Sequence, residues 1–152
     1  MTLLRPSETS GALWKEIDLE IKLWTIPAEH MKAKREHIVP LPPKAFDILE
    51  VMKPISTHLE HVFSSRNNPK QPMYSQTANA ALKRTGYGGK RVAHGLRSIE
   101  STGMNADVIE SALAYTNKNE VRRAYNRSIY LEQRINLMGW WGNYVKSLSA
   151  SN

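Results

Sequence analysis

The sequence predicts an α+β fold in which a short helix and a small antiparallel sheet precede a mostly helical remainder. Three observations support this prediction. Apolar and polar residues alternate through residues 18–27, which is typical of a strand, and a second short apolar run follows at residues 37–41. Apolar residues then recur every three to four positions through residues 128–147, which indicates a long final helix.

The first elements surround the expected hairpin. Residues 7–14 should form a short helix, because Pro6 and Ser7 suit a helix start. The two strands are separated by the polar and basic stretch 29–36. We therefore expect a hairpin whose basic side chains lie at or near the turn.

The middle of the chain predicts a helix followed by irregular structure. Two consecutive prolines should begin a helix that ends at Met52, with Phe46, Ile48 and Leu49 facing inward. Residues 61–64 read as a brief extended segment, and the polar residues that follow as a loop up to Pro72.

The second half predicts helices. Ser75 should cap one that stops at Gly86, and His94 should open another. Asn105 should cap a third, and a further stretch is expected at residues 120–125. The inward positions of the final helix are expected to be Leu131, Ile135, Met138, Trp141 or Gly142, and Val145.

Composition limits the function classes. The chain has 152 residues, enough for one domain, and carries a net charge of +7 with a pI of about 9.7. This charge favours a polyanionic partner such as nucleic acid. There is no cysteine, which excludes disulfides and thiolate metal sites. Neither an apolar run of membrane-spanning length nor a signal peptide is evident.

Two motifs near the C-terminal end indicate phosphodiester chemistry. The first is His94-Gly95-Leu96-Arg97, and the second is Tyr125 among arginines. Arginine and histidine can hold a phosphate and manage its protons, and a phenolate can attack it.

Two further motifs come earlier in the chain. Arg5-Pro6-Ser7-Glu8 places an Arg and a Glu at a helix start, and Lys32 lies in the expected hairpin, eight residues before the proline that ends its second strand. With His94, Arg97 and Tyr125 following in order, the chain resembles the tyrosine recombinase family, most closely the catalytic domain of phage and prophage integrases. The phrases at residues 23–29 and 124–127 look integrase-like as well.

This resemblance implies a mostly helical catalytic domain with a small antiparallel sheet, the DNA breaking-and-rejoining enzyme fold, over residues 1–146. Residues 147–152 are expected to be a frayed tail. The implied reaction is site-specific DNA recombination and integration through a 3′-phosphotyrosyl intermediate, without metal or nucleotide cofactor. The implied catalytic residues are Arg5, Lys32, His94, Arg97, Tyr115 and the nucleophile Tyr125.

The chemistry explains these residue types. Two guanidiniums, Arg5 and Arg97, can clamp the phosphoryl oxygens as negative charge develops, and removing one such donor typically costs about 10²–10³ in rate. His94 would accept the phenol proton of Tyr125. Lys32 would protonate the leaving 5′-oxygen, a role worth about 10²–10⁴. Glu8 is interpreted as a buried structural carboxylate.

Double-stranded DNA is the expected partner, together with a second copy of the chain or a full-length integrase. The residues expected to contact DNA are Lys34, Arg35, Lys90, Arg91, Arg122, Arg123 and Arg127. For the hairpin cations the alternative is a solvated role. Trp140 and Trp141 are interpreted as packing residues rather than base stackers.

Three departures from the family pattern bear on activity. The sequence starts four residues before Arg5, so the family's N-terminal DNA-clamp domain is expected to be missing. Tyr115 stands where the family has a histidine or a tryptophan, and segment 98–114 is shorter than expected. The resulting hypothesis is a truncated prophage integrase of bacterial cytoplasm whose activity is weakened or lost. The alternatives are an inert remnant that binds DNA or an intact integrase, a fragment that folds poorly, and an enzyme like the type IB topoisomerases.

Overall fold

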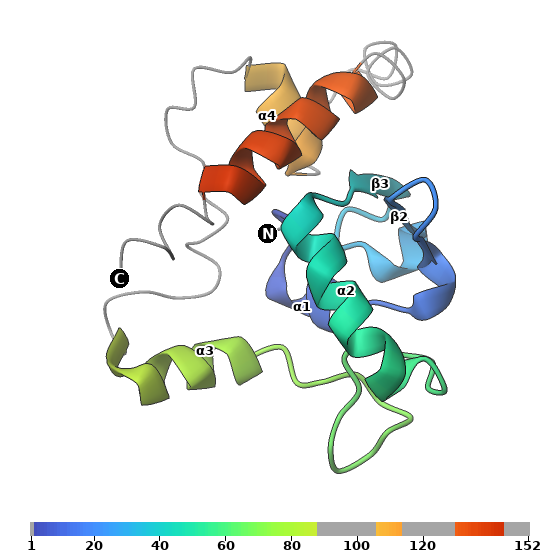
Figure 1. Cartoon of the computed structure of the whole chain (residues 1–152), viewed down its shortest axis with the longest axis vertical. Coiled ribbons are helices and arrows are strands. Elements are labelled where there is room, and N and C mark those ends of the chain that lie inside the picture. Colours follow the sequence, from blue (N-terminus) through green and yellow to red (C-terminus); the bar gives the residue numbers. More distant parts are fainter. Residues whose placement is uncertain (1, 88–105, 114–129, 145–152) are drawn as a thin grey trace.

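The computed structural model describes residues 2–87, 106–113 and 130–144 (Figure 1). Residues 130–144 form the last described helix. The other elements, in chain order, are α1 (Pro6–Ser10), η1 (Trp14–Glu16), β1 (Ile17–Asp18), β2 (Leu23–Ile26), η2 (Ala28–His30), β3 (His37–Pro40), α2 (Pro43–Ser56), α3 (Thr77–Leu82), the π-helical turn η3 (Lys83–Tyr87) and α4 (Ala106–Ala112). The predicted α+β class is confirmed.

The sheet has three antiparallel strands in the order β1-β2-β3. The expected hairpin is the β2–β3 pair, in which Trp24 lies opposite Val39. The prediction of one strand over residues 18–27 is wrong, because the chain turns between β1 and β2. The Asp18 carboxylate accepts the N–H groups of Glu20 (2.9 Å) and Ile21 (3.0 Å), which stabilises a turn in place of a strand.

Helix boundaries differ from the expected ones in the first half. Helix α1 ends at Ser10 rather than Trp14, and the N–H of Gly11 donates to the Ser7 carbonyl at 3.1 Å. Helix α2 continues to Ser56, beyond the expected end at Met52. Leu49 is buried as expected, whereas Ile48 is 40% exposed, so its inward placement is wrong.

Helix α3 begins at Thr77, and its N-cap is Gln76 rather than the expected Ser75. Gly86 has a φ of 85°, a left-handed conformation that glycine adopts readily, so the chain turns there as expected. Residues 61–64 contribute isolated bridges, one between Leu13 and His61, instead of a regular strand.

Two hydrophobic clusters hold the described residues together. The first joins the sheet to α2, and the second joins α4 to helix 130–144, which lie beside each other in Figure 1. Leu3 belongs to the second cluster and its neighbour Leu4 to the first. Leu3 has a φ of 57°, a conformation that is rare for a bulky residue. This bend directs two consecutive side chains into different clusters, immediately before Arg5.

In helix 130–144 Met138 and Gly142 are buried as expected, whereas the inward placement of Ile135 is wrong and Val145 lies outside the described residues. Arg134 is 5% exposed and Ile135 is 49% exposed, whereas the periodicity predicts Ile135 in the core. Leu137 and Met138 are buried beside Arg134 on the observed inward face. Among the helices described, none combines the length and apolar composition needed for a membrane span.

Candidate functional site

Arg5 lies at the N-cap of α1, where its backbone is extended and Pro6 occupies the first helical position. This conformation suits a helix start, because proline has no N–H to leave unsatisfied there. The Arg5 side chain is 21% exposed. It is therefore held against the protein but keeps donors that solvent, or a ligand, can reach.

The Glu8 carboxylate is the centre of this site. Its Oε2 accepts the Arg5 backbone N–H at 2.9 Å, and its Oε1 lies 3.0 Å from Arg5 Nη1. The same Oε1 accepts the Lys32 backbone N–H at 3.4 Å. The Glu8 side chain is 2% exposed, so the pair is shielded from water. The prediction that Glu8 is a buried structural carboxylate is confirmed.

Glu8 therefore brings two expected catalytic residues together. Arg5 and Lys32 lie 27 positions apart in the sequence, and the one carboxylate holds the side chain of the first and the backbone of the second. The Lys32 side chain is exposed, so its ammonium group is available to a ligand at the surface.

The loop that carries Lys32 is anchored at further points. Met31 is 1% exposed and fills the core beneath the loop, and its carbonyl accepts the Lys34 N–H at 2.9 Å. His30 Nδ1 lies 2.6 Å from Glu16 Oε1, and Glu16 Oε2 also accepts the Trp24 indole N–H at 3.0 Å. Two buried carboxylates therefore anchor the loop, Glu8 at the Lys32 backbone and Glu16 at the His30 ring.

Two other hairpin cations were expected to contact DNA. Lys34 is exposed and has a φ of 51°, which lies in the left-handed region. Arg35 is half-buried, and its buried Nε has no hydrogen-bond partner among the described residues. Lys34 is thus placed as a surface contact requires, whereas Arg35 is only partly available.

Two hollows of the described surface do not suit a phosphate. One of about 300 Å³ is lined by residues that include Glu8, Glu16 and Glu60. A larger one of about 880 Å³ is lined by Glu16 and by three further carboxylates, with Lys15 and His30 beside them. Carboxylates repel a phosphodiester, so neither hollow favours a phosphate ligand.

The structure leaves most of the expected site outside its described residues, and their predicted roles stay predictions. These are His94, Arg97, Tyr115 and Tyr125 of the catalytic set, and Lys90, Arg91, Arg122, Arg123 and Arg127 of the DNA-binding set. Within the described part, no group of three or more His, Asp and Glu side chains could hold a metal ion.

Sequence reasoning missed two charged residues that support this region. Glu16 gave no signal of its own, because its role depends on the fold placing Trp24 and His30 nearby. Arg134 interrupts the apolar face of the last helix, and its Nη1 donates to the Ile38 carbonyl at 2.9 Å. Burial lowers the pKa of Arg134.

Comparison with known proteins identifies the family. The model of the phage integrase family matches residues 1–132. The chain is 55% identical to prophage integrase IntA of Escherichia coli K12, over the whole chain and 38% of that protein. It is 37% identical to prophage integrase IntS of the same organism and 36% identical to the integrase of Shigella phage Sf6. These two alignments each cover 95% of the chain and 39% of the relative.

The chain thus spans about two fifths of the length of these relatives. No solved structure gives a significant match. The family match covers most of the chain and includes the Arg5, Lys32, His94, Arg97 and Tyr125 positions. On these grounds the chain belongs to the phage integrase family.

Proposed function

We propose that this chain is a DNA strand-transfer catalyst for site-specific recombination, with residues 1–146 as its catalytic domain. The observation that carries the proposal is the junction at Glu8, which brings Arg5 and the Lys32 backbone to one place in a chain of the phage integrase family. The names of the relatives support an integrase function.

The proposed cleavage step begins with the Tyr125 phenol. Its oxygen attacks the phosphorus of a DNA phosphodiester while His94 accepts the phenol proton. Arg5 and Arg97 donate hydrogen bonds to the non-bridging oxygens, where negative charge develops. The bond from phosphorus to the 5′-oxygen breaks, and Lys32 gives that oxygen a proton. The products are a 3′-phosphotyrosyl link and a free 5′-hydroxyl.

Rejoining reverses these transfers. A 5′-hydroxyl attacks the phosphotyrosyl phosphorus, Lys32 accepts its proton, and the protonated His94 returns one to the Tyr125 oxygen. The energy of the broken phosphodiester is kept in the phosphotyrosyl link. Rejoining therefore needs no external energy source.

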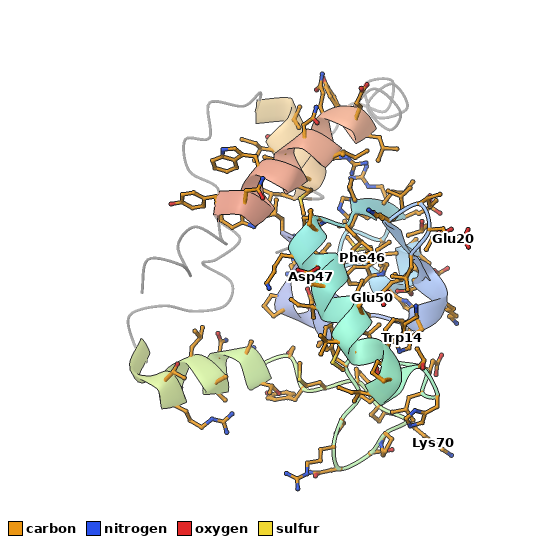
Figure 2. The ribbon with its side chains drawn as sticks, viewed as in Figure 1. Trp14, Glu20, Phe46, Asp47, Glu50 and Lys70 are labelled. Atoms are coloured by element: carbon orange, nitrogen blue, oxygen red, sulfur yellow. The ribbon has the colours of Figure 1, made fainter. Side chains whose placement is uncertain are left out.

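Binding to duplex DNA follows from charge. The net charge is +7, and the exposed Lys32 and Lys34 lie on one loop that two buried carboxylates hold in place. Binding should weaken steeply with salt, with a slope of log K against log salt near −0.9 per phosphate contact. Lys34→Ala should reduce the magnitude of that slope by about 0.9, the value of one phosphate contact. Lys70→Ala should leave the slope unchanged, because Lys70 lies in an exposed loop away from the sheet (Figure 2).

A capture experiment tests the cleavage proposal even though the target sequence is not defined. The chain is incubated with duplexes that carry a randomised window and a nick just beyond it, so that a short 5′-hydroxyl fragment diffuses away after cleavage. Covalent protein–DNA adducts are then recovered under denaturing conditions and sequenced. We expect adducts whose protein end maps to Tyr125.

The variants make this experiment decisive. Tyr125→Phe should abolish the adduct, and Tyr74→Phe, which alters a tyrosine that is 74% exposed, should leave it unchanged. Arg5→Ala should lower the yield about 10²–10³-fold if Arg5 is a transition-state donor. An adduct that persists in Tyr125→Phe would refute the assignment of the nucleophile.

The second candidate function is DNA binding without cleavage. Tyr115 favours it, because a phenol can donate a hydrogen bond to phosphate but cannot carry the positive charge of the histidine expected there. Salt-sensitive DNA binding with no adduct from any sequence in the pool would select this function. If Tyr115→His then produced the adduct, the exchange itself would be the cause.

A further inference from the structure

Arg134 is the most deeply buried cation of the described residues. It is 5% exposed, its Nη1 donates to the Ile38 carbonyl at 2.9 Å, and its buried Nε has no hydrogen-bond partner within the described part of the chain. None of the described carboxylates forms an ion pair with it. Leu137 and Met138, which are almost fully buried, follow it on the same helix face.

Stability alone does not account for this residue. A guanidinium taken out of water loses hydration, and among the described residues its compensation is a hydrogen bond to the uncharged Ile38 carbonyl. Replacing a buried ion by an apolar residue of similar volume is often neutral or stabilising. A methionine at position 134 would therefore satisfy the packing at least as well.

The location of the contact suggests what the arginine provides. Ile38 lies in β3, which follows the loop that carries Lys32 and pairs with β2 through Thr25. Arg134 lies nine residues after Tyr125, on helix 130–144. The hydrogen bond thus joins the element that follows the proposed nucleophile to the hairpin that carries the proposed general acid.

We propose that Arg134 is a positioning residue for DNA strand cleavage, which fixes the helix that follows Tyr125 against the Lys32 hairpin. The proposal rests on the proposed function. The planar guanidinium defines both distance and direction to the Ile38 carbonyl, whereas an apolar side chain allows the helix to slide over the strand. A displacement of about 1 Å between reacting groups can cost about 10²-fold in rate.

The first test compares Arg134→Met with Arg134→Lys on a nicked duplex recovered from the randomised pool. Arg134→Met should lower the single-turnover rate of adduct formation about 10²-fold. Its Kd for DNA should match that of the unaltered chain, since a residue so buried does not reach DNA. Its Tm should match as well, because methionine fills a similar volume in the core. Arg134→Lys can still donate to the Ile38 carbonyl and should recover part of the rate. Ile135→Met, on the exposed side of the helix, is the matched control.

The second test is independent of cleavage. The chain has no cysteine, so spin labels can be attached at Glu36→Cys, next to β3, and at Asn126→Cys, next to Tyr125. Arg134→Met should broaden the distribution of distances between the two labels, and Arg134→Lys should narrow it again.

The two tests separate the two claims. If no sequence yields an adduct but Arg134→Met broadens the label distances at unchanged Tm, the proposed function fails, and what stands is that Arg134 fixes helix 130–144 against the hairpin. If the chain cleaves and Arg134→Met cleaves at the unaltered rate, the positioning role is wrong. A fall in Tm that accounts for the lost rate, without recovery in Arg134→Lys, would also overturn it.

Discussion

Glu8→Ala should destabilise the folded chain because it removes the acceptor of three N–H groups. Two of them belong to Arg5, at 2.9 and 3.0 Å, and the third is the Lys32 amide at 3.4 Å. Hydrogen bonds to a charged group contribute about 1.5–3 kcal/mol each, and breaking a buried ion pair costs about 3–5 kcal/mol. Arg5 is 21% exposed, so water replaces part of what is lost. We expect a loss of about 3 kcal/mol, at the lower end of that range.

Urea unfolding followed by tryptophan fluorescence measures this loss, since the chain has four tryptophans and Trp24 is buried in the adjoining core. Glu8→Gln keeps the volume and one acceptor oxygen, so its loss should be smaller. Glu50→Ala is the control: Glu50 lies on the exposed side of α2 (Figure 2), pairs with Lys53 at 3.5 Å, and should change stability by less than about 0.5 kcal/mol. If Glu8→Ala were as mild as Glu50→Ala, the argument that Glu8 organises the site would be refuted.

Four other substitutions test the packing. Leu3→Ala should cost about 2–5 kcal/mol in urea unfolding, because it empties a 3% exposed position of the second cluster; a loss below about 1 kcal/mol would show that Leu3 does not join that cluster. Gly139→Ala should raise stability by about 1 kcal/mol, because alanine is the better helix former and no atom lies within 4 Å of the added Cβ. Gly142→Ala should gain less, because its Cβ would lie 3.2 Å from Pro42 Cβ, and equal gains would contradict that contact. Ser56→Ala should cost about 1–3 kcal/mol, because the buried Val62 carbonyl would lose the hydrogen bond that the Ser56 hydroxyl donates at 2.8 Å. An unchanged Tm would show that this carbonyl finds another donor.

The sequence was sufficient to predict the fold class and the β2–β3 hairpin, because both depend on local patterns. Alternation indicated the region of β2, a short apolar run indicated β3, and the prolines before α2 marked the helix start. The sequence was not sufficient to show the turn between β1 and β2, since Leu19 and Ile21 continue the alternation through it. There the Asp18 side chain competes with the strand for the backbone N–H groups, and the hydrophobic pattern does not record that competition.

The proposed site rests on residue types read from the sequence, and the described residues bear on only part of its geometry. The motif order placed Arg5 and Lys32 in one site, and the structure joins them through Glu8. The sequence predicted a buried structural role for Glu8, and the structure explains that role by its position at N3 of α1, where the carboxylate reaches back to the N-cap amide. Arg134 was missed because periodicity assigns the core to apolar residues, and Ile135 fits that assignment better than an arginine does.

Two buried charged side chains, Glu8 and Arg134, contact the Lys32 hairpin at different points. The Glu8 carboxylate accepts the Lys32 backbone N–H in the loop between β2 and β3. Arg134 donates to the Ile38 carbonyl in β3, the strand that follows. Each binds a backbone group, so each constrains where the hairpin lies without fixing the Lys32 side chain. A lysine that acts as a general acid needs a fixed backbone position, so that its ammonium group can reach the leaving oxygen, and a side chain that is free to change rotamer. Anchoring the backbone with buried charges while leaving the ammonium exposed would meet both needs of the proposed general acid Lys32.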